Sequence, residues 1–324
     1  MNHPNDLSIA AIIPTFRRDK YLYQTIQKLL EQTRIPDEII IIDQTPVEEQ
    51  DHNIRNYLDC LEREGIITIS RIEKPAVSVA RNVAIGVAES DILLYLDDDI
   101  IPDKRLIECH LRNYNNENID GVVGSVFPPG VNSWISFPND FFNRSLIWQS
   151  FYFTPRYDVP LSNVGFMLGG NFSVRNSSIK KIGGWDENII NYGDRDLGLR
   201  MSKAGYRIDY EPKAKIIHLS APIGGTRVTD PKTPWKGYQR CVSVFYLAFR
   251  HLTMEPRLFI KFGLWRAARF SILLKENAFR PWRWPFEMYS YFKAMYKAYQ
   301  DASNGLKSPY ILIIIYTFVS VLSA

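Results

Sequence analysis

Short apolar runs alternate with amphipathic stretches along the first part of the chain. The apolar runs have strand length, and they are Ile9–Ile13, Glu38–Ile42, Ile66–Ile69, Ile92–Leu96 and Val122–Val126. The stretches between them repeat apolar residues three and four positions apart, which predicts helices over Lys20–Gln32, Val47–Arg63, Ser78–Ala88 and Asp103–Asn115. This alternation predicts a Rossmann-like α/β fold, with a mostly parallel sheet flanked by helices on both faces.

The alternation stops at residues 127–162, where Pro, Asn, Ser and aromatic residues dominate, and we expect an irregular excursion over the sheet. Order returns with an apolar run, two helical patterns and two strand patterns, at Gly165–Val174, from Asn176, Asp194–Ala204, Tyr206–Tyr210 and Lys215–His218. Three helical patterns follow, over Lys236–His251, Pro256–Lys275 and Pro285–Gln300. The sequence therefore predicts an α/β domain over residues 1–220 and a helical region over residues 221–324.

Charge and aromatic residues separate these two parts of the chain. The net charge of +4 over 324 residues does not indicate a nucleic-acid partner. Residues 220–324 carry a balance of +10 and 21 of the 43 aromatic residues, whereas the preceding residues carry −6. Three cysteines far apart form neither a zinc spacing nor a disulfide framework, which favours a reducing compartment. The two parts are therefore expected to present different surfaces.

Neither end of the sequence reads as a simple targeting segment. The first residues lack a basic start followed by an apolar core, so no signal peptide is expected. Near the other end, Tyr310–Leu322 is almost unbroken apolar sequence. A spanning helix needs about 20 apolar residues. This stretch therefore predicts a marginal span, a re-entrant arm or a buried helix.

Three successive carboxylates, Asp97-Asp98-Asp99, follow the strand pattern Ile92–Leu96 directly. Ligands of open α/β sheets bind outside the carboxyl ends of the strands. Adjacent carboxylates repel one another, and hard divalent cations take oxygen ligands. A solvated turn is the alternative for an acidic triplet alone. Asp43, at the end of another strand pattern, favours a nucleotide crevice instead.

Basic residues are expected at the same edge of the sheet. Arg17 and Arg18 follow the first strand pattern, and Arg81 lies in the helical pattern before the acidic triplet. Each alone is typical of a surface charge. Together, at the ends of neighbouring strand–helix units, they favour a site for an anion such as a diphosphate.

Seven ordered blocks resemble the inverting glycosyltransferases of family 2, which have the GT-A fold and act in bacterial surface-polysaccharide assembly. The blocks are Ile12–Arg18, Ile41–Thr45, Ala80–Asn82, Leu96–Asp99, Gly169–Asn171, Gly183–Glu187 and Gly193–Leu197. Their order and spacing match over about two thirds of the chain. The resemblance implies transfer of a sugar from a nucleoside-diphosphate sugar to a hydroxyl of a glycan or lipid-linked acceptor.

The resemblance also implies roles for individual residues. Nucleotide contacts are expected from Pro14, Thr15, Arg17, Asp43, Arg81, Asp97 and Asp98, with Asp43 reading the base as in relatives that use uridine or thymidine diphosphate sugars. A divalent metal, Mg²⁺ or Mn²⁺, is expected on Asp97, Asp99 and His218. Acceptor contacts are expected from Trp185, Asp186 and Asn171, although Trp185 alone is as typical of a core tryptophan. Asp194 is implied as the catalytic base, with Asp196 as its rival.

Two positions depart from the family pattern. Ala76 stands where relatives usually carry Gly, which predicts a stiffer loop or a different approach of the backbone to the ligand. Gly193 replaces the Glu of the family's Glu-Asp pair, so the assignment of the base rests on Asp194 alone. The alternatives are a sugar-phosphate nucleotidyltransferase and an inactive membrane-bound scaffold of the same fold.

Basic and aromatic residues interleave in the C-terminal region. Arg280–Pro285 alternates Trp with Arg, and Tyr289, Phe292, Tyr296 and Tyr299 recur at helical spacing. Trp and Tyr favour the membrane–water boundary, and basic residues favour anionic lipid. We therefore expect peripheral or monotopic attachment to an anionic membrane surface, on the cytoplasmic side. A helical subdomain packed on the catalytic domain is the alternative.

Overall fold

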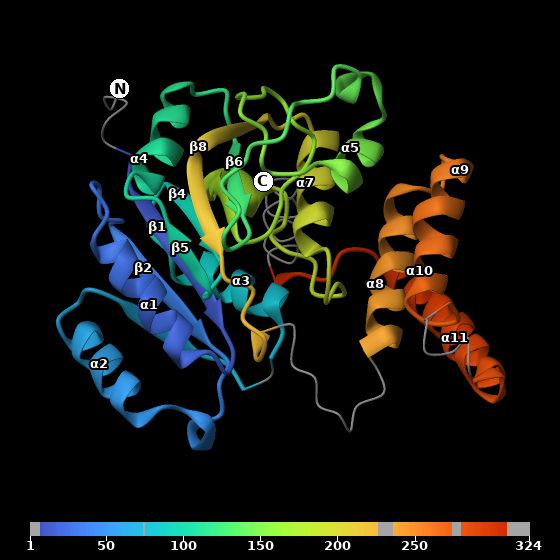
Figure 1. Cartoon of the computed structure of the whole chain (residues 1–324), viewed down its shortest axis with the longest axis horizontal. Coiled ribbons are helices and arrows are strands. Elements are labelled where there is room, and N and C mark those ends of the chain that lie inside the picture. The colour runs from blue at the N-terminus through green and yellow to red at the C-terminus, as the bar shows by residue number, and fades with distance from the viewer. Residues whose placement is uncertain (1–6, 74, 226–235, 274–279, 310–324) are drawn as a thin grey trace, which may run out of the picture.

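The computed structural model describes residues 7–73, 75–225, 236–273 and 280–309. Its strands are β1 (Ile9–Thr15), β2 (Glu38–Asp43), β3 (Thr68–Arg71), β4 (Ile92–Leu96), β5 (Ile100–Pro102), β6 (Gly121–Phe127), β7 (Asn171–Arg175) and β8 (Ile208–His218). They form one eight-stranded sheet in the order β3-β2-β1-β4-β7-β6-β8-β5 (Figure 1). The expected α/β sheet is confirmed.

The sheet has a parallel half and a mixed half. β3, β2, β1 and β4 are parallel, so their carboxyl ends meet at one edge. β7 runs antiparallel to β4 and β6, β6 is parallel to β8, and β5 is antiparallel to β8. The strand order reverses between β1 and β4, and ligands of open α/β sheets bind at such a reversal. The fold therefore places a crevice where β1 and β4 end.

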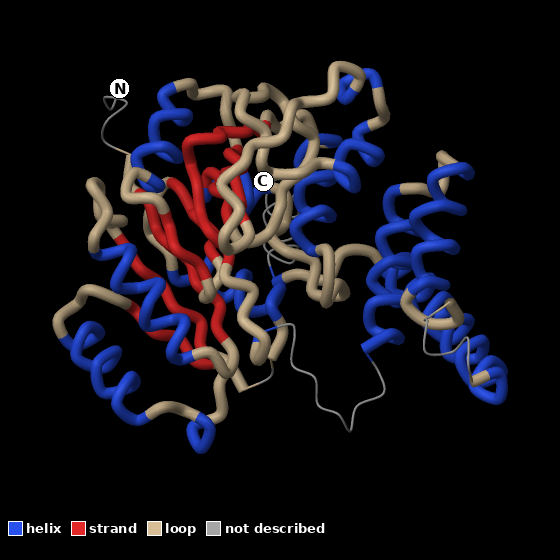
Figure 2. The backbone as a smooth tube through the Cα atoms, viewed as in Figure 1, coloured by secondary structure: helices blue, strands red, loops and turns tan. Residues whose placement is uncertain are grey.

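Alternating side chains of each central strand enter two separate cores. Along β1, Ile9, Ala11 and Ile13 enter one core, and Ala10 and Ile12 enter the other. The first core is covered by α1 (Asp19–Leu30), α2 (His52–Arg63) and α4 (Leu106–Leu111), and the second by α3 (Val77–Val87), α6 (Asn176–Lys181) and α7 (Gly193–Lys203). Figure 2 shows the strands as one layer with helices on both sides. Burial on both faces explains why these strands are continuously apolar.

The C-terminal helices pack together beside α7. They are α8 (Lys236–His251), α9 (Pro256–Leu258), a π-helix (Phe259–Trp265), α10 (Arg266–Arg269), the 3₁₀ turn η7 (Pro281–Arg283) and α11 (Trp284–Asn304). Phe245 of α8 and Tyr291 of α11 lie in a shared core, which also takes in Ile189 from the loop before α7. No helix among the described residues combines the length and the apolar character that crossing a bilayer requires. The domain boundary expected after residue 220 stays a prediction.

The structure differs from the expected elements at several boundaries. The helix expected over Val47–Arg63 is split into η1 (Val47–Glu49) and α2, because Asp51 caps α2 by accepting hydrogen bonds from two of its backbone amides. The two strands expected near the end of the α/β part are one strand, β8. A bulge opposite Gly124 and Ser125 absorbs the residues between Glu211 and Lys215.

Other segments are shorter or more irregular than expected. The helix expected over Asp103–Asn115 is α4 followed by the 3₁₀ turn η2 (Arg112–Asn115). Only Asn171–Arg175 of the apolar run forms a strand, and the irregular excursion contains η3 (Phe141–Asn143) and α5 (Leu146–Tyr152). The helix expected over Pro256–Lys275 is interrupted by the π-helix. The apolar segment Tyr310–Leu322 lies outside the described residues.

Candidate active site

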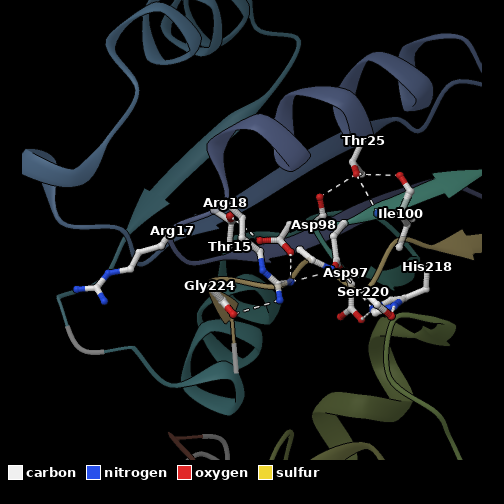
Figure 3. A network of polar contacts seen from close by, with 12 residues as sticks. Thr15, Arg17, Arg18, Thr25, Asp97, Asp98, Ile100, His218, Ser220 and Gly224 are labelled. Atoms are coloured by element: carbon white, nitrogen blue, oxygen red, sulfur yellow. Dashed lines mark hydrogen bonds and ion pairs between the residues drawn. The ribbon is translucent and has the colours of Figure 1, made fainter. Parts of the chain in front are cut away.

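The acidic triplet lies where β4 ends, and His218 at the end of β8 lies beside it. β5 continues directly from the triplet and pairs with β8, so that Ile100 is opposite His218. The Nε2 atom of His218 is 3.1 Å from Oδ2 of Asp97 and 3.3 Å from Oδ1 of Asp99. One ligand atom from each of Asp97, Asp99 and His218 lies within 4.8 Å of the others. Figure 3 shows the side chains of Asp97 and His218 next to each other. The sheet therefore brings all three expected metal ligands together.

The chemistry of this cluster fits a divalent cation. Carboxylate oxygens suit Mg²⁺ and Mn²⁺, and neutral imidazole is a common additional ligand. Burial acts to raise the pKa of Asp97, but the hydrogen bond with His218 and the charge of Arg81 outweigh it and lower the pKa below its ordinary value. Asp99 is fully buried, and its second oxygen accepts a hydrogen bond from the amide of Ala221 at 2.7 Å. The Asp97 carboxylate is thus kept ionised, and the Asp99 carboxylate is held in place by the backbone.

Asp98, the middle residue of the triplet, turns into the protein. It accepts hydrogen bonds from Oγ1 of Thr15 and from Nη1 of Arg18, both at 2.8 Å. Oγ1 of Thr25 donates to the carbonyl of Asp98 at 2.9 Å and fixes the turn. Burial raises the pKa of Asp98 to about 6, although the charge of Arg18 opposes the rise. Asp98 and Thr15 therefore fix the position of the turn that carries the acidic triplet.

The two arginines after β1 have different environments. Arg18 is buried, lies 3.3 Å from Asp99 through Nη1, and donates from Nε to the carbonyl of Ile223 at 2.9 Å. Arg17 adopts a positive φ of 57°, and its guanidinium pairs with Glu49. Figure 3 shows Arg17 pointing away from the other labelled residues. The structure therefore does not bring Arg17 to the expected nucleotide site, and it places Arg18 there instead.

Asp43 lies behind the crevice rather than in its wall. Its side chain is buried, 2.5 Å from Nη1 of Arg55, and its Oδ1 accepts the amide of Thr45 at 2.9 Å. Arg55 of α2 also pairs with Asp19. The neighbouring residue Gln44 lines the crevice. In this conformation both oxygens of Asp43 are held by the chain, so the expected contact with the base stays a prediction.

Two adjoining cavities open beside the cluster. The first, with a volume of about 280 Å³, has walls that include Pro14, Arg18, Gln44, Asp97, Asp98, His218, Gln239 and Arg240. The second, about 430 Å³, has walls that include Arg81, Asp97, Asp194 and Arg195. Asp97 belongs to both walls. We name them for the substrates expected from the sequence, the first the donor cavity and the second the acceptor cavity.

Asp194 and Asp196 begin α7 but face different surroundings. Asp194 lines the acceptor cavity, and its Oδ2 accepts the amide of Gly169 at 2.6 Å. Asp196 has no exposed surface and lies 2.7 Å from Nε of Arg200 and 2.8 Å from Nε2 of His251. Burial acts to raise the pKa of Asp196, but these partners lower it to about 2. Of the two, only Asp194 lines the cavity.

A model described as Glycosyl transferase family 2 matches residues 10–183, more than half of the chain. The chain belongs to this family. It is therefore a glycosyltransferase, and the family match favours this activity over the nucleotidyltransferase alternative. The matched residues include β4 and the acidic triplet that follows it, whereas His218 at the end of β8 lies beyond them.

Curated relatives resemble this glycosyltransferase at low identity. A glucosyl-dolichyl phosphate glucuronosyltransferase of Haloferax volcanii is 22% identical over 65% of this chain and 69% of its own. The O-antigen chain rhamnosyltransferase WbaN of Salmonella anatum is 26% identical over 65% and 66%. An N-acetylglucosaminyl-diphospho-decaprenol L-rhamnosyltransferase of Mycobacterium tuberculosis is 32% identical over 40% and 46%. The match thus spans about two thirds of the first two relatives and under half of the third.

A solved structure shares the fold. The crystal structure of GalNAc-T7 with UDP, GalNAc and Mn²⁺ aligns with a TM-score of 0.56 at 14% identity, over 75% of this chain and 50% of that one. At this identity the likeness shows the GT-A-like fold. The expected fold class is therefore confirmed.

The three residues expected to contact the acceptor have no exposed surface in the structure. The guanidinium carbon of Arg81 lies over Trp185, 4.3 Å from the centroid of the Trp185 ring. Arg81 itself lines the acceptor cavity. Asp186 accepts the hydroxyl of Tyr246, and Asn171 donates to two backbone carbonyls at 3.0 and 2.8 Å. These contacts support the cavity wall from behind, so direct contact with an acceptor requires another conformation.

The two departures from the family pattern have simple local consequences. Ala76 has φ −155°, an extended backbone that any residue adopts, so the loop gains no strain from the missing glycine. A Cβ at Gly193 would lie 3.3 Å from Oγ of Ser78 and 3.4 Å from the ring of Trp185. The neighbouring Tyr192 has a φ of 71°, which is strained for a bulky residue. The start of α7 is therefore tightly packed.

Sequence reasoning missed three arginines that lie near these residues. Arg55 lies on the buried face of α2 with Leu58 and Leu61, and a cation at such a position could have signalled a buried acid. Arg195 follows Asp194 directly and had no assigned role. Arg240 of α8 reaches the donor cavity without any motif in the sequence that could have indicated it.

Proposed function

We propose that this glycosyltransferase is metal-dependent and inverting, and that it moves a sugar from a uridine or thymidine diphosphate sugar to a hydroxyl of a glycan or lipid-linked acceptor in surface-polysaccharide assembly. The observation that carries the proposal is the meeting of two cavities at Asp97. One cavity adjoins a cluster of metal-ligating groups, and the other contains a carboxylate, Asp194.

The donor half of the proposal rests on Asp97, Asp99 and His218 as holders of Mg²⁺ or Mn²⁺. A divalent cation bound there would offset the negative charge of the nucleoside diphosphate as it leaves. Arg81, which lowers the pKa of Asp97 through its charge, adds a second positive group near the same point. The fold neighbour with UDP and Mn²⁺ supports a uridine-type donor.

The acceptor half rests on Asp194. The acceptor oxygen forms a bond to the anomeric carbon while the bond from that carbon to the diphosphate oxygen breaks. Asp194 takes the hydroxyl proton, and the bond electrons leave with the nucleoside diphosphate. The amide of Gly169 donates a hydrogen bond to this carboxylate and fixes its orientation in the first turn of α7. A single base and a direct displacement invert the anomeric centre.

Nucleotide-sugar binding tests the proposal directly. Purified full-length protein is heated with a panel of nucleotide sugars and with UDP, in Mn²⁺, in Mg²⁺ and in a chelator. We expect one uridine or thymidine diphosphate sugar to raise the melting temperature, and only when a metal is present. Equal protection in the chelator would contradict metal dependence, and protection only by guanosine diphosphate sugars would contradict the donor class.

An aromatic and basic surface on the C-terminal helices supports attachment to an anionic membrane. Trp282, Tyr289 and Tyr296 are 73%, 65% and 63% exposed and recur at spacing of seven along η7 and α11. Arg280 and Lys293 are exposed beside them. The names of two relatives state lipid-linked acceptors, and the C-terminal region has a charge balance of +10. We place the enzyme on the cytoplasmic face as a peripheral or monotopic protein.

Liposome flotation tests this attachment. The full chain should float with vesicles containing anionic lipid, and a Trp282→Ala/Tyr289→Ala double variant should float several-fold less. Trp134→Ala is the matched control, because Trp134 is 41% exposed on the α/β part. Full-length protein that stays in the soluble fraction with anionic vesicles at low salt would contradict the attachment.

A further inference from the structure

Two arginines from different parts of the chain share one pair of aromatic rings at the edge of the acceptor cavity. The guanidinium carbon of Arg195 lies 4.9 Å from the ring centroid of Phe151 and 5.4 Å from that of Tyr192. The guanidinium carbon of Arg266, in α10, lies 5.5 and 5.6 Å from the same two centroids. Cation–π contacts hold both positive charges at this place.

Neither arginine has an acidic partner within ion-pair distance among the described residues. Nη1 of Arg195 and Nε of Arg266 are buried and have no hydrogen-bond partner there. Burial lowers the pKa of Arg195, the charge of Asp194 opposes this effect, and the charge of Arg266 adds to it. Buried donors without partners cost free energy, so a structure that retains two of them indicates a missing ligand.

The position of these groups indicates what the ligand is. Arg195 lines the acceptor cavity next to Asp194, where the acceptor hydroxyl is expected. The positive φ of Tyr192 turns the chain just before Asp194 and Arg195. Phe262 of the π-helix stacks on Phe151, with the two ring centroids 4.3 Å apart. The C-terminal helices thus fix the aromatic pair and deliver Arg266 to it. Two cations without a carboxylate partner match a ligand with about two negative charges, as on a phosphate or diphosphate.

We propose that the acceptor cavity recognises the phosphate or diphosphate group of a lipid-linked acceptor, with Arg195 as its direct ligand and Arg266 as the second positive charge. This inference rests on the proposed function, because it assigns the negatively charged part of the acceptor to the cavity that holds the base. It also gives Arg266, which belongs to the basic C-terminal region, a role beside the acceptor cavity.

Binding of farnesyl diphosphate to the full-length protein tests the inference without requiring turnover. Saturating UDP and Mn²⁺ first fill the donor cavity, so that the prenyl diphosphate reports on the second cavity alone. Isothermal titration calorimetry should then detect binding, and Arg195→Ala should weaken it about 10- to 100-fold. Arg269→Ala is the matched control, because Arg269 is an exposed arginine in the same short helix as Arg266. It should leave the affinity unchanged.

Further probes separate the possible sources of the negative charge. Farnesol should bind weakly and without dependence on Arg195, and inorganic pyrophosphate should bind more weakly than farnesyl diphosphate. Pyrophosphate that binds as tightly as farnesyl diphosphate would overturn the lipid-linked assignment. If methyl glucuronide alone bound in an Arg195-dependent way, the ligand group would be a carboxylate and the phosphate assignment would be wrong. Unchanged affinity in Arg195→Ala would overturn the inference. Because UDP binding is measured first, its failure would be a failure of the proposed function and would be seen separately.

Discussion

The donor cavity and the acceptor cavity meet at Asp97 but differ in how their charged residues are paired. In the donor cavity the acidic groups are paired with basic groups of the chain, as Asp98 is with Arg18 and Asp97 is with His218. In the acceptor cavity Arg195 has no acidic partner among the described residues. The donor side is therefore pre-organised by its own pairs, whereas the acceptor side keeps positive charge available for a ligand.

The two cavities also depend on different parts of the chain. The acidic cluster comes from the ends of β4 and β8, so the sheet itself sets its geometry. The loop before α7 is held instead by α8. Oγ of Ser243 accepts the amide of Asn191 at 3.2 Å, and the hydroxyl of Tyr246 donates to Asp186. Changes in the C-terminal helices should therefore affect acceptor use more than donor binding.

Asp99→Asn should have the largest effect, because it removes a metal ligand without changing the shape of the side chain. Loss of several kcal/mol of charge stabilisation corresponds to a fall of roughly 10³-fold in transfer. Metal-dependent UDP binding should be lost with it, as measured by calorimetry in Mn²⁺ and in a chelator. Asp59→Asn, an exposed acid on α2, is the control. Metal-dependent UDP binding that survives in Asp99→Asn would show that the cluster does not hold the metal.

Asp194→Asn should affect the acceptor side, by slowing transfer without weakening donor binding. We expect kcat to fall about 10²- to 10³-fold, since the acceptor proton loses its base, while UDP binding in Mn²⁺ stays at the wild-type level. Steady-state kinetics and calorimetry on the same preparation separate the two effects. Asp196→Asn should instead lower the melting temperature, because Arg200 and His251 lose a buried partner. Transfer at the normal rate by Asp194→Asn would remove the base assignment.

The donor side could be predicted from sequence because its residues adjoin the strands. The position of Asp97 and Asp99 follows from the end of β4, and His218 follows from the end of β8. Arg17 and Arg18 show the limit of this reasoning. A turn with positive φ at Arg17 directs one guanidinium to Glu49 and the other to Asp98, and the sequence pattern does not distinguish them.

The acceptor side could not be predicted in the same way. Its geometry depends on contacts between residues far apart in sequence, such as Phe151 with Phe262 and Asp196 with His251. Periodicity reports which face of a helix is apolar, but it does not report which distant helix covers that face. Trp185 illustrates the result, since an aromatic residue in a matching motif proved to be fully buried.

His251→Ala tests whether the acceptor side depends on the C-terminal helices. Nε2 of His251 donates to the buried Asp196 from α8, so the variant removes a charge-assisted hydrogen bond worth about 1–3 kcal/mol. The melting temperature should fall, and KM for the acceptor should rise while UDP affinity is preserved. His52→Ala, at the exposed start of α2, should change none of these values. An equal loss of UDP affinity in His251→Ala would show that the two cavities are not supported separately.

The smallest effect is expected at Arg17, and it can be compared with the effect at the neighbouring Arg18 in the donor cavity. The exposed pair with Glu49 contributes at most about 1 kcal/mol to stability, and the side chain points away from the cavity, so Arg17→Ala should change UDP affinity less than twofold. Arg18→Lys keeps the charge but cannot reproduce the bonds to Asp98 and to the carbonyls of residues 223–224, so it should weaken UDP binding several-fold. Calorimetry in Mn²⁺ compares the two. A larger loss of UDP affinity in Arg17→Ala than in Arg18→Lys would support the nucleotide contact that the sequence pattern assigned to Arg17. The turn after β1 would then have to reorganise when the donor binds.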